Sequence, residues 1–245
     1  MTATVLEARG LTRVFPGRPP VHALRGVDLT VNAGEFVTLM GPSGCGKSTL
    51  LHLLGGLDVP DEGTVHLQGR RVDTLGEAAR AKLRRRTVGY VFQSLNLVAS
   101  LTARENVEMI GALGGMSPAQ ARQRADELLE RLGVAERSSD LPARMSGGEQ
   151  QRVAIARAMV NEPAVVLADE PTGNLDSRAA SAVVDLLDEL RASGPAVVLV
   201  THDARVAARA DRALRMHDGA IAGGTSLREA ASAAEVRARL AGLEA

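Results

Sequence analysis

Several features are scarce in this chain of 245 residues, and each scarcity excludes a class of protein. The single cysteine, Cys45, rules out an internal disulfide bond. The net charge is zero, which argues against a nucleic-acid partner, because proteins that bind nucleic acids usually carry a basic excess. No run of about 18 apolar residues occurs, so we expect no membrane-spanning helix. With no N-terminal signal region either, the sequence predicts a cytoplasmic protein.

Aromatic residues make up only 2% of the chain, and tryptophan is absent. Hydrophobic residues still amount to 45%, so we expect a sizeable core built from Leu, Val, Ala and Ile. The length is that of one large domain, or of a core with a lobe attached.

Lysine is also scarce, because 29 basic residues include only Lys47 and Lys82. Lys47 lies in a glycine-rich stretch that follows an apolar strand pattern and precedes a helical one. This stretch fits the phosphate-loop pattern and predicts a cradle of backbone N–H groups for ATP. We expect Lys47 to reach the β and γ phosphates and Ser48 to bind Mg²⁺. The residues of the predicted cradle are Gly41, Pro42, Ser43, Gly44, Cys45, Gly46, Lys47, Ser48 and Thr49.

Polar residues follow three predicted strands, at 88–92, 164–168 and 196–200. Because ligands bind at the carboxyl ends of parallel strands, we expect these residues to share one catalytic site with the phosphate loop. Gln93 and Asp169 are predicted metal contacts, with Asp169 acting through water. Glu170 is the candidate general base, and His202 is expected to orient Glu170 or donate to the γ-phosphate. The alternative for Asp169 and Glu170 is an ordinary polar strand end.

Two further sequence features lie outside the predicted phosphate loop and strand ends: an aromatic residue and a second glycine-rich helix start. Phe15 is either a stacking platform for adenine or a core residue at a strand end. Ser146, Gly147, Gly148 and Glu149 form a second glycine-rich helix start, which is suited to anions. This second start opens a separate helical lobe. We therefore expect a second subunit, packed head to tail, to contribute it to the ATP site.

These motifs, in this order, resemble those of the ATP-binding-cassette (ABC) ATPases up to about residue 222. Phe15 corresponds to the A-loop, Gly41 to Thr49 to Walker A, and Gln93 to the Q-loop. Ser146 to Gln150 corresponds to the signature, Ala164 to Asp169 to Walker B, and His202 to the H-loop. Asn174-Leu175-Asp176 corresponds to the D-loop. The signature departs from the commonest form of the family at Met145 and Glu149.

The resemblance implies an α/β fold of the P-loop NTPase (RecA-like) type. Its mostly parallel sheet would carry an N-terminal antiparallel β subdomain and an inserted α-helical subdomain. We expect a nucleotide-binding domain over 1–222, with the helical subdomain at about 94–158. A short helical extension over 223–245, starting near Thr225, would follow. We expect Ser226 and Glu229 to form a capping box at its start. The cofactors implied are ATP and Mg²⁺, and the implied assembly is a head-to-tail homodimer.

Further segments, such as Leu54 to Asp58 and Pro171 to Asp176, resemble one branch of the family. That branch contains the lipoprotein-releasing, macrolide-exporting, bacitracin-resistance and cell-division ATPases. The resemblance implies a separate permease with a large extracytoplasmic domain, docked in a groove formed by Gln93 to Asn106 and the helical lobe. The chain would then lie at the cytoplasmic face of the cell membrane. Two alternatives stay open: a regulatory ATPase that controls a cell-wall enzyme through its membrane partner, and a soluble cassette protein acting on nucleic acid or ribosomes.

Overall fold

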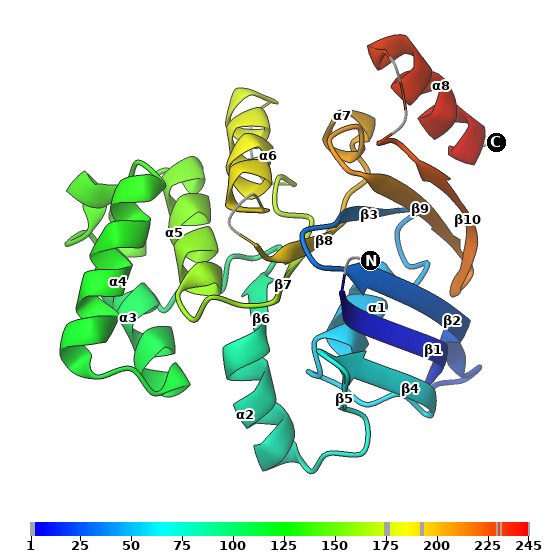
Figure 1. Cartoon of the computed structure of the whole chain (residues 1–245), viewed down its shortest axis with the longest axis horizontal. Helices are drawn as coiled ribbons and strands as arrows, with labels where there is room; N and C mark the ends of the chain where they lie inside the picture. Colours follow the sequence, from blue (N-terminus) through cyan, green and yellow to red (C-terminus); the bar gives the residue numbers. More distant parts are fainter. Residues whose placement is uncertain (1–2, 174–176, 192–193, 229, 231, 245) are drawn as a thin grey trace.

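The computed structural model describes residues 3–173, 177–191, 194–228, 230 and 232–244. Two sheets and a group of helices make up this part of the chain (Figure 1). The larger sheet has the strand order β10-β9-β3-β8-β7-β6 and is parallel except for β10, which runs antiparallel to β9. The smaller sheet is antiparallel, with the order β2-β1-β4-β5.

The central strands of the larger sheet are short and almost wholly apolar. They are β3 (Phe36–Met40), β7 (Val165–Asp169) and β8 (Ala196–Val200), and every residue in them is buried. In β7, Val165 and Leu167 pack into one core cluster while Val166 and Ala168 pack into the other. Layers cover both faces, which explains why these strands are continuously hydrophobic. The sequence prediction of two buried strands at 164–168 and 196–200 is therefore confirmed.

The antiparallel sheet is built on two long strands. β1 (Thr4–Phe15) and β2 (Val21–Asn32) each continue through a glycine, with β4 (Glu62–Leu67) and β5 (Arg70–Arg71) alongside. Gly10 and Gly26 adopt φ values of 59° and 79° where the register of the pair shifts. Because glycine tolerates positive φ, each acts as a bulge instead of a strand end.

Helices of the inserted lobe form a group apart from the antiparallel sheet (Figure 1). They are α3 (Ala103–Gly114), α4 (Pro118–Arg131) and α5 (Gly147–Met159), with two short 3-10 turns, Ala135–Arg137 and Pro142–Arg144. A capping box begins each of the three helices, at Thr102, Ser117 and Ser146. The box at Ser117, with Pro118 in the first helical turn and Gln120 as its partner, has the sequence signature of a helix start.

A buried asparagine fixes the segment that enters this lobe. Asn106 is fully buried, and its side chain accepts a hydrogen bond from the Val98 amide. The same side chain donates to the carbonyls of Val98, Leu101 and Thr102. Its polar atoms are thus satisfied despite burial, and residues 98–102 are held against α3.

Other helices surround the larger sheet. α1 (Lys47–Leu54) follows β3, and α2 (Glu77–Thr87) precedes β6 (Val88–Val91). α6 (Ser177–Arg191) and α7 (Ala204–Ala207) follow β7 and β8. The Tyr90 hydroxyl donates to the Leu51 carbonyl in the last turn of α1, which ties this helix to the neighbouring strand.

The C-terminal part differs from the expectation of a helix from Thr225. Two strands that were not predicted, β9 (Arg212–His217) and β10 (Ala220–Ser226), form an antiparallel hairpin here. Residue 222 thus lies inside a strand, and α8 begins only at Ala233 (Ala233–Glu244). Ser226 pairs with Arg212 at the end of β10, so it does not cap a helix; its expected capping partner, Glu229, lies outside the described residues.

Candidate active site

A cleft of about 400 Å³ lies at the carboxyl ends of the parallel strands. It gathers most of the residues that the sequence indicated, and β2 contributes Val21 and Ala23 as well. The predicted residues that line it are Phe15, Ser43, Gly44, Gly46, Lys47, Ser48, Thr49, Gln93, Asp169 and Glu170.

Two glycines let the phosphate loop pass very close to neighbouring backbone. A Cβ atom at Gly41 would lie 2.2 Å from the Met216 carbonyl oxygen, and one at Gly46 would lie 2.3 Å from that of Ala23. Both glycines also have positive φ values, 146° and 104°. A side chain at either position would clash with backbone that cannot move aside, so the loop geometry requires glycine here.

Lys47, the first residue of α1, hydrogen-bonds back to the start of the phosphate loop. Its ammonium donates to the carbonyls of Gly41 and Pro42, each at 2.8 Å, and only 6% of the residue is exposed. The third nearby group is the Cys45 thiol, whose sulfur lies 3.8 Å away. An anionic oxygen is a stronger acceptor for an ammonium group than a neutral carbonyl, so a phosphate in the loop would compete well for Lys47.

Cys45 is buried beneath the loop, in the core cluster between the two sheets. Its carbonyl accepts a hydrogen bond from Gly219 in the β9–β10 turn, at 3.1 Å, and the Gly219 carbonyl accepts from the Arg25 amide, at 2.8 Å. This turn therefore links the phosphate loop to β2. This turn was not predicted, although Asp218-Gly219 is a typical turn pair of β-hairpins.

Glu170 is held in a strained conformation at the end of β7. Its φ value of 43° is in the left-handed region, which costs about 1–3 kcal/mol for a residue with a side chain. The Glu170 amide donates to the Val200 carbonyl at 3.1 Å, and the Gly173 amide donates to the Glu170 carbonyl at 3.0 Å. These two bonds hold the strained backbone, and Glu170 lines the cleft.

His202 lies beside Glu170. Its Nδ1 atom is 3.4 Å from Glu170 Oε2, and its side chain is 70% exposed. His202 does not itself line the cleft as Glu170 does. The contact places the imidazole where it can orient the carboxylate.

Gln93 begins a strained turn that lies between the cleft and a second, apolar groove. Leu95 and Asn96 have φ values of 59° and 51°, and both of their carbonyls accept hydrogen bonds from the Arg157 guanidinium on α5. Arg157 is almost completely buried, and burial lowers the pKa of its guanidinium. Because this buried cation satisfies both carbonyls, it stabilises two consecutive left-handed residues that would otherwise relax. The sequence carried no signal for this role of Arg157.

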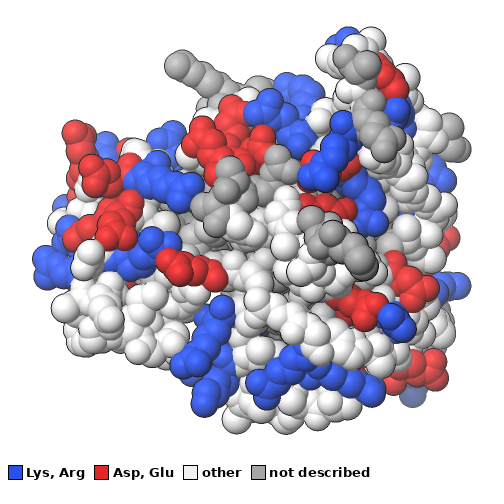
Figure 2. Space-filling model, viewed as in Figure 1, with Lys and Arg blue, Asp and Glu red and all other residues white. Residues whose placement is uncertain are grey.

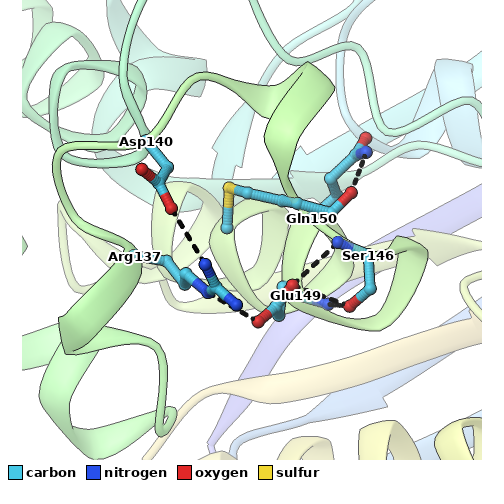
Figure 3. A network of polar contacts seen from close by, with 6 residues as sticks. Arg137, Asp140, Ser146, Glu149 and Gln150 are labelled. Atoms are coloured by element: carbon cyan, nitrogen blue, oxygen red, sulfur yellow. Dashed lines mark hydrogen bonds and ion pairs between the residues drawn. The ribbon is translucent and has the colours of Figure 1, made fainter.

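The signature residues lie apart from the cleft, at the start of α5 (Figure 3). Glu149 Oε2 accepts hydrogen bonds from the Ser146 amide at 2.7 Å and from the Ser146 hydroxyl at 2.8 Å. Glu149 Oε1 accepts from Arg137 Nε at 2.9 Å, and Arg137 also pairs with Asp140. The backbone hydrogen bond from Ser146, with the Ser146 hydroxyl and Arg137, holds the pKa of Glu149 below its usual value.

The chemistry of the cleft suits a metal-bound triphosphate. Ser48, Gln93 and Asp169 offer the oxygen donors that Mg²⁺ prefers. Within the described ranges, no group of three or more His, Cys, Asp and Glu residues could hold a metal. A Mg²⁺ ion here would therefore need oxygen ligands from phosphates and water as well, as is usual for this ion. Asp176 of the expected D-loop lies outside the described residues.

Comparison with known proteins now decides the family. A family model described as "ABC transporter" matches residues 24–173, which is more than half of the chain. The chain belongs to the ABC transporter family. It is an ATP-binding-cassette ATPase, so the predicted family and fold class are confirmed.

The cassette resembles parts of larger export proteins. It is 46% identical to the macrolide export ATP-binding/permease protein MacB of Hyphomonas neptunium over 233 residues, covering 95% of this chain and 36% of the relative. It is 48% identical to the pyoverdine export ATP-binding/permease protein PvdT of Pseudomonas aeruginosa, and the match covers 89% of this chain and 33% of the relative. The chain thus spans about a third of the length of these relatives, which support the predicted branch.

Solved cassettes share the fold over nearly the whole chain. The dimeric structure of a post-hydrolysis state of the ATP-binding cassette MJ0796, bound to ADP and Pi, superposes with a TM-score of 0.86 at 39% identity. It covers 92% of this chain and 100% of that one. Within the described part of the cassette, no helix is both long enough and apolar enough to cross a bilayer.

We predict that Arg157→Met destabilises the cassette, because the methionine fills the space but leaves the Leu95 and Asn96 carbonyls without their donor. The expected loss is about 2 kcal/mol in the free energy of unfolding, measured by urea denaturation. The matched control is Arg122→Met on the exposed face of α4, which should change stability by less than about 0.5 kcal/mol. Equal stability of the two variants would show that Arg157 does not hold the turn.

Proposed function

We propose that this cassette is the ATP-binding and ATP-hydrolysing subunit of a bacterial membrane transporter. It dimerises head to tail on ATP and drives a permease. One observation carries the proposal: a single cleft holds Lys47, Asp169 and Glu170, while the signature residues at Ser146 lie outside it. A chain that carries both halves of an ATP site apart from each other can complete the site with a second copy.

Adenine would stack on Phe15. The ring is 37% exposed at the mouth of the cleft, and the Arg13 guanidinium lies 5.0 Å from its centroid. Arg13 is itself held by ion pairs with Asp58 and Asp61, both at 2.9 Å. This arrangement keeps the ring in place and supports the stacking role over that of a core residue.

The phosphates would lie in the loop from Gly41 to Thr49. Lys47 would exchange its two carbonyl acceptors for phosphate oxygens, and the backbone N–H groups at the start of α1 would bind the remaining negative charge. Ser48 and Gln93 would hold a Mg²⁺ ion directly, and Asp169 would hold it through water. The ion would supply positive charge that neutralises the transferred phosphoryl group.

Glu170 is the proposed general base. Its carboxylate faces the cleft, where it can accept the proton of a water molecule that attacks the γ-phosphorus. His202, whose Nδ1 lies 3.4 Å from this carboxylate, would orient Glu170 or donate to the γ-phosphate. The products are ADP and inorganic phosphate.

The second copy would supply Ser146, Gly147, Gly148 and Glu149. The N–H groups at the start of α5 and the Ser146 hydroxyl are suited to a phosphate. Within one chain, however, the Glu149 carboxylate already accepts from the Ser146 hydroxyl. An incoming phosphate must therefore displace this carboxylate, so we propose that Glu149 opposes closure of the dimer.

The permease would dock in a groove of about 240 Å³ beside the turn that starts at Gln93. Apolar side chains, among them Leu57, Phe92 and Ile110, line this groove together with Arg84 and Arg85. It adjoins the helical lobe and suits an amphipathic helix with acidic residues. The permease would carry a large extracytoplasmic domain. The cassette would lie at the cytoplasmic face of the membrane.

We propose that the chain consists of one domain and a short C-terminal extension. Residues 1–222 form the nucleotide-binding domain, with the helical subdomain at about 94–158, and 223–245 form an extension. β10 crosses this boundary, so the extension starts within the last strand of the sheet. The D-loop at Asn174 to Asp176 belongs to the proposed dimer contact.

We predict that Glu170→Gln retains ATP binding, abolishes turnover and accumulates a closed dimer, because the amide cannot accept the proton. Light scattering with and without ATP measures the dimer, and phosphate release measures turnover. Glu189→Gln, an exposed glutamate on α6, is the matched control and should hydrolyse ATP at the wild-type rate. Normal hydrolysis by Glu170→Gln would contradict the role of Glu170, and a monomer at saturating ATP would contradict the dimer.

We predict that adding Glu149→Gln to the Glu170→Gln chain lowers the ATP concentration for half-maximal dimerisation several-fold, because a neutral amide competes less with phosphate. The cap should survive, since Gln120 makes the same two contacts with Ser117, at 2.9 and 2.8 Å. Glu105→Gln, in the cap at Thr102, removes the same charge elsewhere in the lobe and should leave the midpoint unchanged. A midpoint that rises or stays the same with Glu149→Gln would refute the opposing role of Glu149.

A further inference from the structure

Basic residues are concentrated in one short segment of this neutral chain. Between residues 70 and 86 there are seven basic residues and only two acidic ones, Asp73 and Glu77, so the segment carries a net charge of +5. The remainder of the chain must carry −5. Such an asymmetry is a feature of surfaces that meet an anionic partner.

The structure brings this charge to one surface. We define the basic strip as the exposed and half-buried members of the segment: Arg70, Arg71, Lys82, Arg84, Arg85 and Arg86. The seventh, Arg80, is buried. The strip combines β5 with α2, and Figure 2 shows basic side chains gathered on the lower part of the visible face.

Most of the strip has no internal counter-charge. Arg71 pairs with Asp73, and Arg84 lies 3.9 Å from Glu77. None of the ion pairs between described residues involves Arg70, Lys82, Arg85 or Arg86. Lys82 lies three and four residues from Arg85 and Arg86, so like charges share one face of α2 and repel each other. An anionic surface outside the molecule would relieve this repulsion.

The strip also adjoins the groove proposed for the permease. Arg84 and Arg85 belong to the strip and line the groove as well, next to Leu57 and Phe92. This step rests on the proposed function: if a membrane-embedded permease docks in the groove, the strip faces the bilayer. Charge attraction acts over a Debye length, about 10 Å at 0.1 M salt, and clusters of about four to eight basic residues bind anionic membranes.

We propose that the basic strip binds the anionic headgroups of phospholipids and so holds the cassette against the membrane beside its permease. A nucleic acid is the less suitable partner, because the chain as a whole is neutral and the strip continues into an apolar groove. Lipid binding would orient α2 and the groove toward the bilayer independently of the permease contact.

The test is co-sedimentation of the purified chain with vesicles of phosphatidylcholine alone or with about 30% phosphatidylglycerol. Binding is expected only to the anionic vesicles, and it should fall steeply as salt is raised from 0.1 to 0.5 M. The variant R70A/K82A/R86A keeps Arg84 and Arg85 in the groove. Its partition should fall about a hundredfold, since each basic side chain near an anionic membrane contributes about fivefold.

The matched control is R122A/R131A/R237A, which removes three exposed arginines from α4 and α8 and should bind within about threefold of wild type. Equal binding of the two triple variants, or equal binding to both kinds of vesicle, would overturn the proposal. So would a chain that ignores the vesicles and binds duplex DNA. ATP hydrolysis, measured on the same preparations, tests the proposed function separately from lipid binding. An active chain that does not bind vesicles refutes the lipid contact alone. An inactive chain refutes the ATPase function.

Discussion

The phosphate loop is in close contact with backbone from both sheets. Gly41 lies against the Met216 carbonyl of β9, and Gly46 lies against the Ala23 carbonyl of β2. The loop is therefore held between the two sheets. Any shift of one sheet relative to the other would change the loop, which explains why the antiparallel sheet packs so tightly on the parallel core.

Two strained turns surround this loop, and buried polar contacts stabilise each of them. Glu170 depends on hydrogen bonds with Val200 and Gly173, and Leu95 and Asn96 depend on Arg157. Strain of this kind persists only where the surrounding structure imposes it. Both turns border the cleft, and the second also borders the groove. A single short turn thus separates the groove from Gln93.

Much of the site could be predicted from the sequence because its residues follow local rules. The phosphate loop has a characteristic spacing of glycines, and Asp169 directly follows a strand whose apolar run marks it as buried. The hairpin of β9 and β10 escaped prediction because its strands are short and rich in Arg, Ala and Gly. The contacts of Arg157 with residues 61 and 62 positions away follow from tertiary packing alone. No local pattern encodes them.

Lys47 donates to two loop carbonyls, and in the proposed function it exchanges them for the phosphate oxygens of ATP. The most direct measurement is the dissociation constant of Mg-ATP, by isothermal titration calorimetry, for the wild type and for Lys47→Ala. The other lysine of the chain supplies the control, Lys82→Ala, which removes the same charge from an exposed face of α2. We expect Lys47→Ala to weaken binding by at least about tenfold and Lys82→Ala to leave it unchanged. Equal affinity of all three proteins would show that Lys47 does not bind the phosphates.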